Sequence, residues 1–345
     1  MAVEMIETRP DASGHEWDTF LRAHQHSSFY HCFGWRRLNQ EQLGHKSVYL
    51  EARSGGSVVG ILPLVLTNSR LLGRILCSMP FVNYGGPLAV DAETTQRLLE
   101  EAQRHATRIR ANYLEIRCAA PLEADLPVQL HKVSMTLALE ADPEMLWSKF
   151  TSKHRTNIRR AYKDGLTVVA GGLELLSEFC AVMQRSWRDL GTPLYAPGYF
   201  KAIVDAFPDQ TRIFVCRRNG EPTAVAFNGY FAATVEGMWA GTTPAGHELQ
   251  ANYVLYWEMI KHACERGFRR YHLGRSTAGS GAEQFKKKWN AVTTQLYWYH
   301  YRPDGRKDTF LNVDNPKFRA AIAVWRKLPL WATRVLGPPI ARLIP

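Results

Sequence analysis

One order of predicted strands and helices occurs twice along the chain, and this repeat limits the possible folds more than any other feature of the sequence. The first copy is predicted to contain three strand regions, a helix and a final strand, at 47–53, 58–67, 75–90, 92–110 and 113–117. Its helix carries apolar residues at helical spacing. The second copy repeats this order at 212–217, 223–231, 234–240, 250–266 and 271–275.

The two copies match in layout more than in identity. Asn219-Gly220 marks a hairpin turn in the second copy, where the first copy has two glycines. The final strands match at an offset of 158 residues, which places Tyr271 at the position of Tyr113 and Arg275 at the position of Arg117. The sequence therefore predicts a duplicated domain.

A segment of different composition joins the copies. Residues 119–141 contain prolines and an extended run, and Asp142-Pro143 then begins a helix with a capping residue and a proline in its first turn. No GxGxxG turn of a dinucleotide-binding domain occurs. The sequence predicts an α+β fold with two tandem domains, 1–141 and 142–310, of mixed, mainly antiparallel sheets flanked by helices, followed by a basic and apolar tail over 311–345.

Positive charge is concentrated in three stretches. The formal net charge is +11, and residues 149–163 hold six basic residues without an acidic one. Residues 266–288 hold seven basic residues and one acidic residue, and residues 301–345 hold nine and three. Clusters of this kind indicate an anionic partner such as phosphates, nucleic acid or an acidic membrane surface, and solvated helix faces are the alternative explanation.

The sequence disfavours several locations and chemistries. No window reaches the ~18 consecutive apolar residues of a membrane span, and the acidic N-terminus lacks the apolar core of a signal peptide. The six cysteines contain no CxxC pair, and the histidines show no metal-ligand spacing, so we expect a cytoplasmic protein without a metal site. No GxSxG motif of a serine hydrolase occurs.

Three local motifs lie in the second copy and in the segment before it. They are the basic segment 153–166, the segment 248–260, and Tyr271-His272-Leu273-Gly274-Arg275-Ser276 followed by Phe285-Lys286-Lys287-Lys288-Trp289. Together they resemble the FemAB family, whose best-known members transfer amino acids from aminoacyl-tRNA to peptidoglycan precursors. The resemblance covers residues 17–301 and implies two tandem GNAT-like domains, that is, domains of the acyl-CoA N-acyltransferase type.

Further details narrow the resemblance. Arg275-Ser276-Thr277, the segment 285–289 and the tail are most similar to FemAB-like proteins associated with exopolysaccharide and PEP-CTERM sorting systems. The coiled-coil insertion of some FemAB ligases is absent, since residues 160–173 leave no room for it. The segment 241–248, where a GNAT enzyme would hold the pyrophosphate of CoA, lacks the usual glycine signature. The donor therefore stays open between aminoacyl-tRNA and acyl-CoA, with CoA disfavoured.

The resemblance implies roles for individual residues. Lys286 follows an aromatic residue in the family's F-K motif and would face the reacting carbonyl or the acceptor's phosphates, and Arg275 would lie near the reaction. Arg155 and Arg159 share one helix face and would bind the phosphates of a diphosphate-linked sugar. The remaining substrate-binding candidates are Asn83, Tyr84, Trp239 and Asn252. The alternative for each residue is a role in packing or on a solvated surface.

The sequence thus predicts an N-acyl- or aminoacyltransferase that acts on an amine of a cell-envelope or exopolysaccharide precursor, with a phosphate-bearing sugar or lipid-linked acceptor. Two alternatives stay open: a CoA-dependent GNAT acetyltransferase, and a non-catalytic module that binds a polysaccharide or another anionic ligand. The tail combines Trp, Leu and Arg residues. This composition suits peripheral contact with an anionic membrane, or a strap across the second domain.

Overall fold

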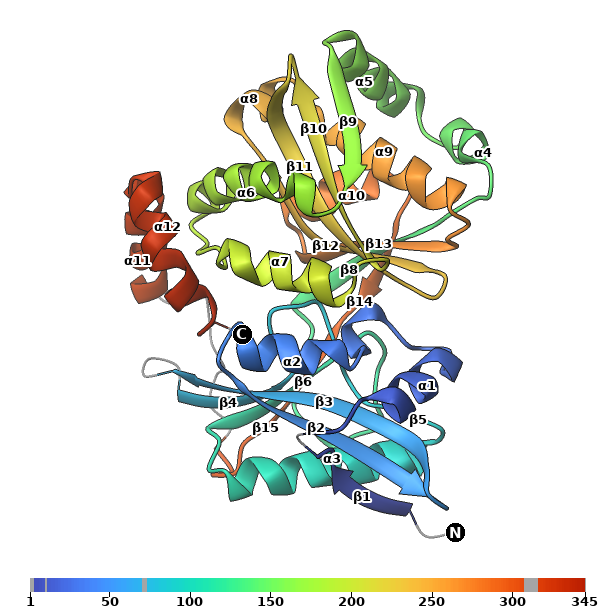
Figure 1. Ribbon diagram of the computed structural model, residues 1–345, viewed down its shortest axis with the longest axis vertical. Coiled ribbons are helices and arrows are strands. Elements are labelled where there is room, and N and C mark those ends of the chain that lie inside the picture. The colour runs from blue at the N-terminus through green and yellow to red at the C-terminus, as the bar shows by residue number, and fades with distance from the viewer. Residues whose placement is uncertain (1–2, 10, 70–72, 307–315, 345) are drawn as a thin grey trace.

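Two β-sheets, one above the other, form the framework of the computed structural model, which describes residues 3–9, 11–69, 73–306 and 316–344 (Figure 1). The first sheet has the order β1 (Val3–Glu7), β2 (Lys46–Ser54), β3 (Ser57–Ser69), β4 (Gly73–Ser78), β6 (Tyr113–Cys118), β15 (Tyr297–Tyr301) and β7 (Val128–Gln129), with β5 (Leu88–Ala89) on β3. The second has the order β14 (Val292–Gln295), β8 (Lys132–Ala138), β13 (Arg270–Thr277), β12 (Thr234–Thr242), β11 (Glu221–Phe231), β10 (Thr211–Arg218) and β9 (Leu166–Gly171).

Helices pack against both sheets. The first half contains α1 (His15–Ala23), the 3₁₀ helix η1 (Phe29–His31), α2 (Gly34–Glu41) and α3 (Ala92–Arg108). The second half contains α4 (Pro143–Ser148), α5 (Ser152–Lys163), η2 (Leu173–Leu175), α6 (Leu176–Leu190), α7 (Pro197–Ala206), α8 (Pro244–Glu248), α9 (Ala251–Glu265) and α10 (Gly281–Lys287). Two further helices, α11 (Pro316–Lys327) and α12 (Leu330–Ala341), follow.

The alternation of side chains along the strands explains how the layers pack. In β2, Val48 lies in a core shared with α3, whereas Tyr49 lies in another core that contains Trp17 of α1. In β10, Phe214 lies in a core shared with α9, whereas Val215 lies in the core that contains Trp17. That central core therefore takes residues from both halves and holds them together.

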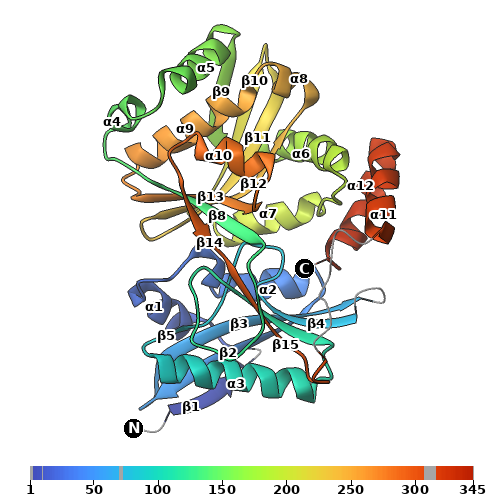
Figure 2. The ribbon, with the colours of Figure 1, turned by 180° about the vertical axis from the view of Figure 1, so that it is seen from behind.

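The two sheets exchange strands at the seam between the halves. β8 precedes the predicted boundary at residue 141 but pairs with β13 and β14 of the second sheet. β15 lies within the predicted second domain, 142–310, but pairs with β6 and β7 of the first sheet. Figure 2 shows β14 and β15 leading from the upper half to the lower one. Sheet membership therefore does not follow the predicted boundary.

The predicted α+β class, with mixed and mainly antiparallel sheets flanked by helices, is confirmed. Among the described strands, only β4–β6 and β12–β13 pair in parallel. The predicted hairpin turn at Asn219 and Gly220 has φ angles of 51° and 85°, as a type I′ turn requires. The Asp142 side chain accepts a hydrogen bond from the Glu144 amide at 2.9 Å and caps α4, as predicted.

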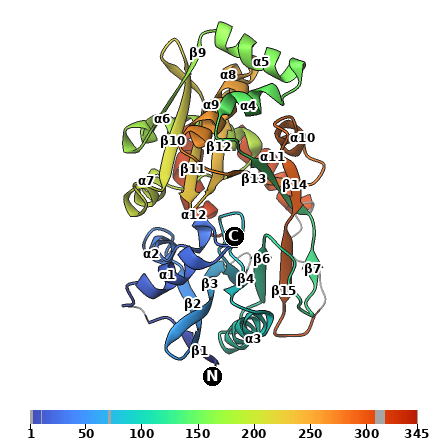
Figure 3. The ribbon, with the colours of Figure 1, turned by 90° about the vertical axis from the view of Figure 1, so that its right-hand side faces the viewer.

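The described part of the tail is a helical hairpin that packs against α6. Arg334 Nε donates to Gln184 Oε1 of α6 at 2.8 Å. The Arg342 carbonyl oxygen lies 2.6 Å from His45 Nε2 of the first half, so α12 ends beside the seam (Figure 3). Residues 311–315 of the predicted tail lie outside the described residues. In the described part of the chain, no helix combines the length and apolarity that a membrane crossing needs.

Candidate functional site

A gap opens between β12 and β13, the two parallel strands of the second sheet. They pair over three positions, the last of which joins Glu236 and His272, and then separate. Gly274 lies at φ +81° where β13 bends, and a β-carbon there would come within 2.7 Å of the Gly237 carbonyl oxygen. The bend therefore requires glycine at position 274.

A cavity of about 530 Å³ lies at this gap, on the seam between the halves. Its walls come from β12, β13, α6, α9 and α10 of the second half and from Tyr30 and residues 81–83 of the first half. Ala341 and Ile344, at the end of the tail, complete the lining. This volume suits a small substrate or the reacting end of a larger one.

Four of the eight residues predicted from the sequence line this cavity, and a fifth lies next to one of them. Asn83, Trp239, Arg275 and Lys286 line it. Tyr84 is buried next to Asn83, and its hydroxyl group forms hydrogen bonds behind the cavity wall. The structure thus brings together both catalytic candidates and three of the six substrate-binding candidates.

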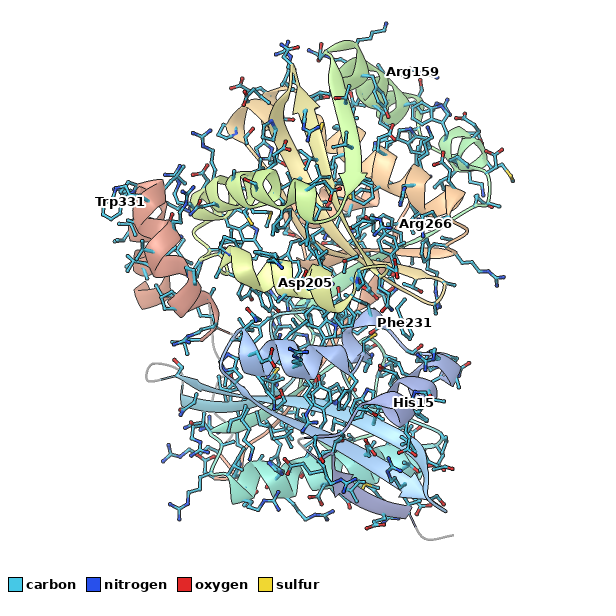
Figure 4. All side chains as sticks on the ribbon, viewed as in Figure 1. His15, Arg159, Asp205, Phe231, Arg266 and Trp331 are labelled. Carbon is cyan, nitrogen blue, oxygen red and sulfur yellow. The ribbon has the colours of Figure 1, made fainter. Side chains whose placement is uncertain are left out.

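Arg155 and Arg159 lie elsewhere, on α5, and do not line the cavity. Arg155 Nη1 donates to the Ser148 carbonyl oxygen at 2.9 Å, and Arg159 Cζ lies 5.4 Å from the centre of the Trp147 ring. Figure 4 shows Arg159 on the outer side of the upper half, away from the seam. Their helical spacing is as predicted, but the face that carries them is remote from the gap.

Lys286 fixes the bend of β13. Its side chain is 7% exposed, and Nζ donates to the carbonyl oxygens of Gly274 (2.8 Å) and Arg275 (3.1 Å) and to the hydroxyl of Ser276 (3.0 Å). All three ammonium hydrogens therefore have acceptors. Burial, and then Arg275, lower the pKa of Lys286 to about 8. The ammonium group adds positive charge to the cavity while its hydrogens hold the strand.

Arg275 presents its guanidinium group to the cavity with little support from the protein. Its Nη1 is buried and has no hydrogen-bond partner among the described residues. Its Cζ lies 5.3 Å from the centre of the Trp298 ring. Burial, and then Arg117, lower the pKa of Arg275 to about 10. A partly buried cation whose Nη1 lacks an acceptor is available to bind an anionic group.

A buried carboxylate that the sequence analysis missed lies beside the cavity. Glu236 is fully buried, and its Oε1 accepts a hydrogen bond from the Tyr84 hydroxyl at 2.5 Å and lies 3.0 Å from His272 Nδ1. Its Oε2 has no hydrogen-bond partner in the described part of the chain. Burial opposes the charged form of His272, but Glu236 outweighs it and raises the pKa of this imidazole. The sequence signal for this residue is a single glutamate in a strand that has no other charged residue.

Tyr30 connects the cavity to this carboxylate. The residue lines the cavity, and Asn83 Nδ2 donates to its hydroxyl at 2.8 Å. Burial, and then Glu236, raise the pKa of Tyr30 well above its usual value. Tyr30 therefore lines the cavity within electrostatic reach of Glu236.

The turn before α9 uses its polar groups internally. Thr243 Oγ1 accepts a hydrogen bond from the Gly246 amide at 3.0 Å, and a β-carbon at Gly246 would come within 2.4 Å of the Thr223 carbonyl oxygen. Asn252, which does not line the cavity, accepts a hydrogen bond from Thr242 Oγ1 at 2.6 Å and ties α9 to the end of β12. This closed turn agrees with the absence of a pyrophosphate signature in the sequence.

Known proteins share this architecture. Residues 148–287 match the family described as an acetyltransferase (GNAT) domain. No curated protein matches the sequence. The structure is similar to FemX, with a TM-score of 0.67 and 15% identity over 86% of this chain and 97% of FemX.

Two further solved structures extend the likeness. A tandem GNAT protein from the clavulanic acid biosynthesis pathway has a TM-score of 0.54 and 12% identity, over 89% of this chain and 100% of its own. L-PGS from Bacillus licheniformis has a TM-score of 0.53 and 15% identity, over 96% of this chain and 98% of its own. Identities this low show a common fold alone. The chain therefore has the fold of two tandem GNAT-like units, as predicted, and residues 148–287 of its second unit match the GNAT acetyltransferase domain.

Proposed function

We propose that this chain transfers an acyl or aminoacyl group to an amine held in the cavity at the seam. The observation that carries the proposal is the gap between β12 and β13, which leads to a cavity lined mainly by the half that matches the GNAT domain. Transfer to an amine needs a proton acceptor and positive charge near the developing oxyanion. Glu236 supplies the first, and Lys286 and Arg275 supply the second.

In the proposed step, the amine nitrogen forms a bond to the acyl carbon, and the bond from that carbon to the donor's sulfur or oxygen breaks. The charges of Lys286 and Arg275 stabilise the oxyanion. The proton that the amine loses passes along Tyr30 to Glu236. The leaving sulfur or oxygen then takes up this proton, which restores the carboxylate.

We propose a phosphate-bearing sugar or lipid-linked precursor of the cell envelope or of an exopolysaccharide as acceptor, and aminoacyl-tRNA as donor. The likeness to FemX supports this choice, and the closed turn before α9 supports a donor other than CoA. A cytoplasmic location and an association with PEP-CTERM sorting systems belong to the same proposal. The second candidate is a CoA-dependent acetyltransferase, which the match to the GNAT acetyltransferase domain favours.

Thermal stabilisation followed by a transfer assay tests these alternatives, because a ligand that binds the folded state raises the melting temperature. The panel contains CoA, acetyl-CoA, charged tRNA and UDP-N-acetylhexosamines. Stabilisation by sugar nucleotide or tRNA, with none by CoA, supports the main proposal. Stabilisation by CoA and acetyl-CoA, with acetyl transfer, supports the second candidate. Binding of a polysaccharide with no transfer from any donor would leave a binding module and contradict both.

We also propose that the tail contacts an anionic membrane surface. Trp331 and Val335 lie one helical turn apart on α12 and are 72% and 67% exposed. Figure 4 shows Trp331 on the outer side of the hairpin. Residues 316–344 include several arginines and lysines and no acidic residue. An apolar surface bordered by cations suits the surface of an anionic membrane.

Sedimentation with vesicles tests this membrane contact. Full-length protein should bind vesicles that contain phosphatidylglycerol more strongly than vesicles of phosphatidylcholine alone. Changing Trp331→Ser together with Val335→Ser should lower the bound fraction severalfold. Val292→Ser, at an exposed apolar residue of β14, is the matched control. Equal binding of all variants would contradict the proposal and leave the tail as a strap on α6.

A further inference from the structure

Two arginines from equivalent strand ends meet at one tryptophan. Trp298 of β15 pairs with Arg117 of β6 in the first sheet, and Arg117 Cζ lies 4.1 Å from the centre of the indole ring. Arg275 of β13, in the second sheet, lies 5.3 Å from the same ring centre. Two guanidinium groups, one from each half, therefore share one ring at the seam.

The polar atoms around this ring include several hydrogen-bond donors without acceptors. Arg117 Nη1, Arg275 Nη1 and Trp298 Nε1 are buried, and none has a hydrogen-bond partner among the residues that the structure describes. Ser134 pairs with Arg275 across β8 and β13, so the two side chains leave the same face of the sheet. The buried Ser134 hydroxyl also lacks a partner there. Each such group costs free energy unless water or a ligand meets it.

One carboxylate neutralises the arginine of the first half. Glu115 Oε1 accepts hydrogen bonds from Arg117 Nε at 2.7 Å and from Arg117 Nη2 at 2.6 Å. Glu115 Oε2 lies 3.0 Å from His300 Nε2. Both carboxylate oxygens of Glu115 therefore have partners. Among the described residues, Arg117 Nη1 is left without an acceptor.

Among the described residues, no carboxylate forms an ion pair with Arg275, the arginine of the second half. Glu236, the other buried carboxylate beside the cavity, pairs with His272. Lys132 and Lys286 add further positive charge. Burial is the largest cause, and the charge of Arg275 the second, that lowers the pKa of each lysine to about 8. Burying this much uncompensated charge is unfavourable, and the arrangement becomes favourable when an anion occupies the site.

We infer that Arg275, the free edge of Arg117, the Trp298 N–H and the Ser134 hydroxyl form a subsite for an oxyanion of the substrate, either a carboxylate or a phosphate group. Arg275 lines the cavity, so the anion enters from that side. Guanidinium groups bind both kinds of oxyanion through paired hydrogen bonds. The subsite's role in transfer rests on the proposed function: the anion anchors the substrate so that its reacting group lies at the gap between β12 and β13.

The melting temperature of a variant without Arg275 distinguishes a purely structural role of this residue from anion binding. If Arg275 only joined the halves by stacking on Trp298, its removal would lower the melting temperature. If it is held ready for an anion, removal of this partly buried, unneutralised cation should raise the melting temperature of the ligand-free protein. The variant Arg275→Met keeps an extended apolar side chain and removes the charge.

Calorimetric titration of the full chain with pyrophosphate and, separately, with N-acetylglycine tests the inference at constant ionic strength. At least one probe should bind saturably, and its identity distinguishes a phosphate from a carboxylate. Arg275→Met should weaken that Kd at least about tenfold. Trp298→Phe keeps a ring and loses the N–H, and should weaken it about threefold. Arg104→Met, at an exposed ion pair with Glu101 on α3, is the control.

Several outcomes would overturn the subsite. They are the absence of saturable binding by either probe, an unchanged Kd in Arg275→Met, and weaker binding together with a lower melting temperature in that variant. Binding that depends on Arg275, without transfer from any donor, would leave the subsite standing and remove the proposed function. The two proposals therefore fail separately.

Discussion

The two parallel strand pairs of the molecule, β4–β6 and β12–β13, begin alike and end differently. Each pairs over three positions. At the end of β4, the Ser78 hydroxyl oxygen accepts a hydrogen bond from the Arg117 amide at 2.8 Å, and beyond the strand the Gly85 amide donates to the Arg117 carbonyl oxygen at 3.1 Å. These hydrogen bonds fill the space between the ends of β4 and β6, whereas the gap between β12 and β13 leads to the cavity.

The segment that closes the first gap also forms a wall at the second. A β-carbon at Gly86 would come within 2.5 Å of Cys118 Sγ, so only glycine allows this turn to lie against the end of β6. Phe81 and Asn83, from the same segment, line the cavity. The duplication therefore provides two equivalent strand ends: the segment 78–86 fills the space at the first, and the second leads to the cavity.

One residue distinguishes the charges at the two strand ends. At the offset of 158 that matches Arg117 with Arg275, Leu273 takes the place of Glu115. Arg117 therefore has a carboxylate two residues before it, and Arg275 has none. The same fold thus gives a neutralised arginine in the first half and an available one in the second.

The largest expected effect is on the transfer rate. It distinguishes the third paired position of the β12–β13 pair, Glu236, from the matching position of the β4–β6 pair, Cys77. Glu236→Gln removes the proton acceptor and should lower the transfer rate by ~10²–10⁴-fold, with the melting temperature showing that the variant is folded. Cys77→Ala, at the matching position of the filled gap, should leave the rate within about twofold once folding is verified. Equal losses in both variants would contradict the functional difference between the gaps.

A second prediction concerns stability in the first half. Glu115→Gln leaves Arg117 buried without its carboxylate and should lower the free energy of unfolding by about 3 kcal/mol at neutral pH, measured by urea denaturation. Glu123→Gln, at an exposed position, is the control. Arg275→Met should instead raise the free energy of unfolding. If Arg275→Met and Glu115→Gln lowered this free energy by similar amounts, the proposed difference between the two arginines would be wrong.

The pH dependence of Glu115 sharpens this second prediction. Burial raises the pKa of Glu115, but Arg117 and His300 outweigh it and lower the pKa to about 2. A carboxyl group with a lowered pKa stabilises the folded state above its unfolded value of about 4.3 and loses this effect as the pH falls toward 2. The difference in stability between wild type and Glu115→Gln should therefore shrink between pH 5 and pH 2.

A third, smaller effect concerns the pH dependence of anion binding in the second half. Lys286 and Lys132 have pKa values lowered to about 8, so both lose charge as the pH rises from 7 to 9. Binding of the anionic probe should weaken severalfold over this range. Lys286→Met should flatten the profile, provided that its melting temperature shows an intact bend at Gly274. A pH-independent Kd in the wild type would exclude a contribution of these lysines.

Local patterns in the sequence were enough to predict the strands and helices of the repeated order. Asn219-Gly220 can form its turn with little help from the rest of the chain, and the Asp142 cap depends on residues within three positions. The placement of β15 in the first sheet could not be predicted in this way. Residues 297–301 are aromatic throughout, save for His300, and nothing in them indicates a partner more than 170 residues earlier in the chain.

The site was predicted where a motif carries it and missed where distant parts of the chain create it. Arg275 and Lys286 lie in a motif that resembles a known family, and both line the cavity. Glu236 has no motif, because one carboxylate in a strand has no spacing to compare. Arg117 was matched with Arg275 in the repeat, but their meeting at Trp298 depends on how the two halves stack.

The smallest expected effect separates two positively charged surfaces of the second half. Arg155 and Arg159 lie on α5 and do not line the cavity, so Arg155→Gln together with Arg159→Gln should change the Kd of the small anionic probe by less than about twofold at physiological salt. A loss equal to that of Arg275→Met would transfer the anion site to α5.

If the donor is aminoacyl-tRNA, the same double variant should weaken tRNA binding and reduce its salt dependence, because exposed arginines bind nucleic acid mainly through its phosphates. Weaker tRNA binding with an unchanged probe Kd would assign α5 to the donor and the seam to the reacting end of the substrate.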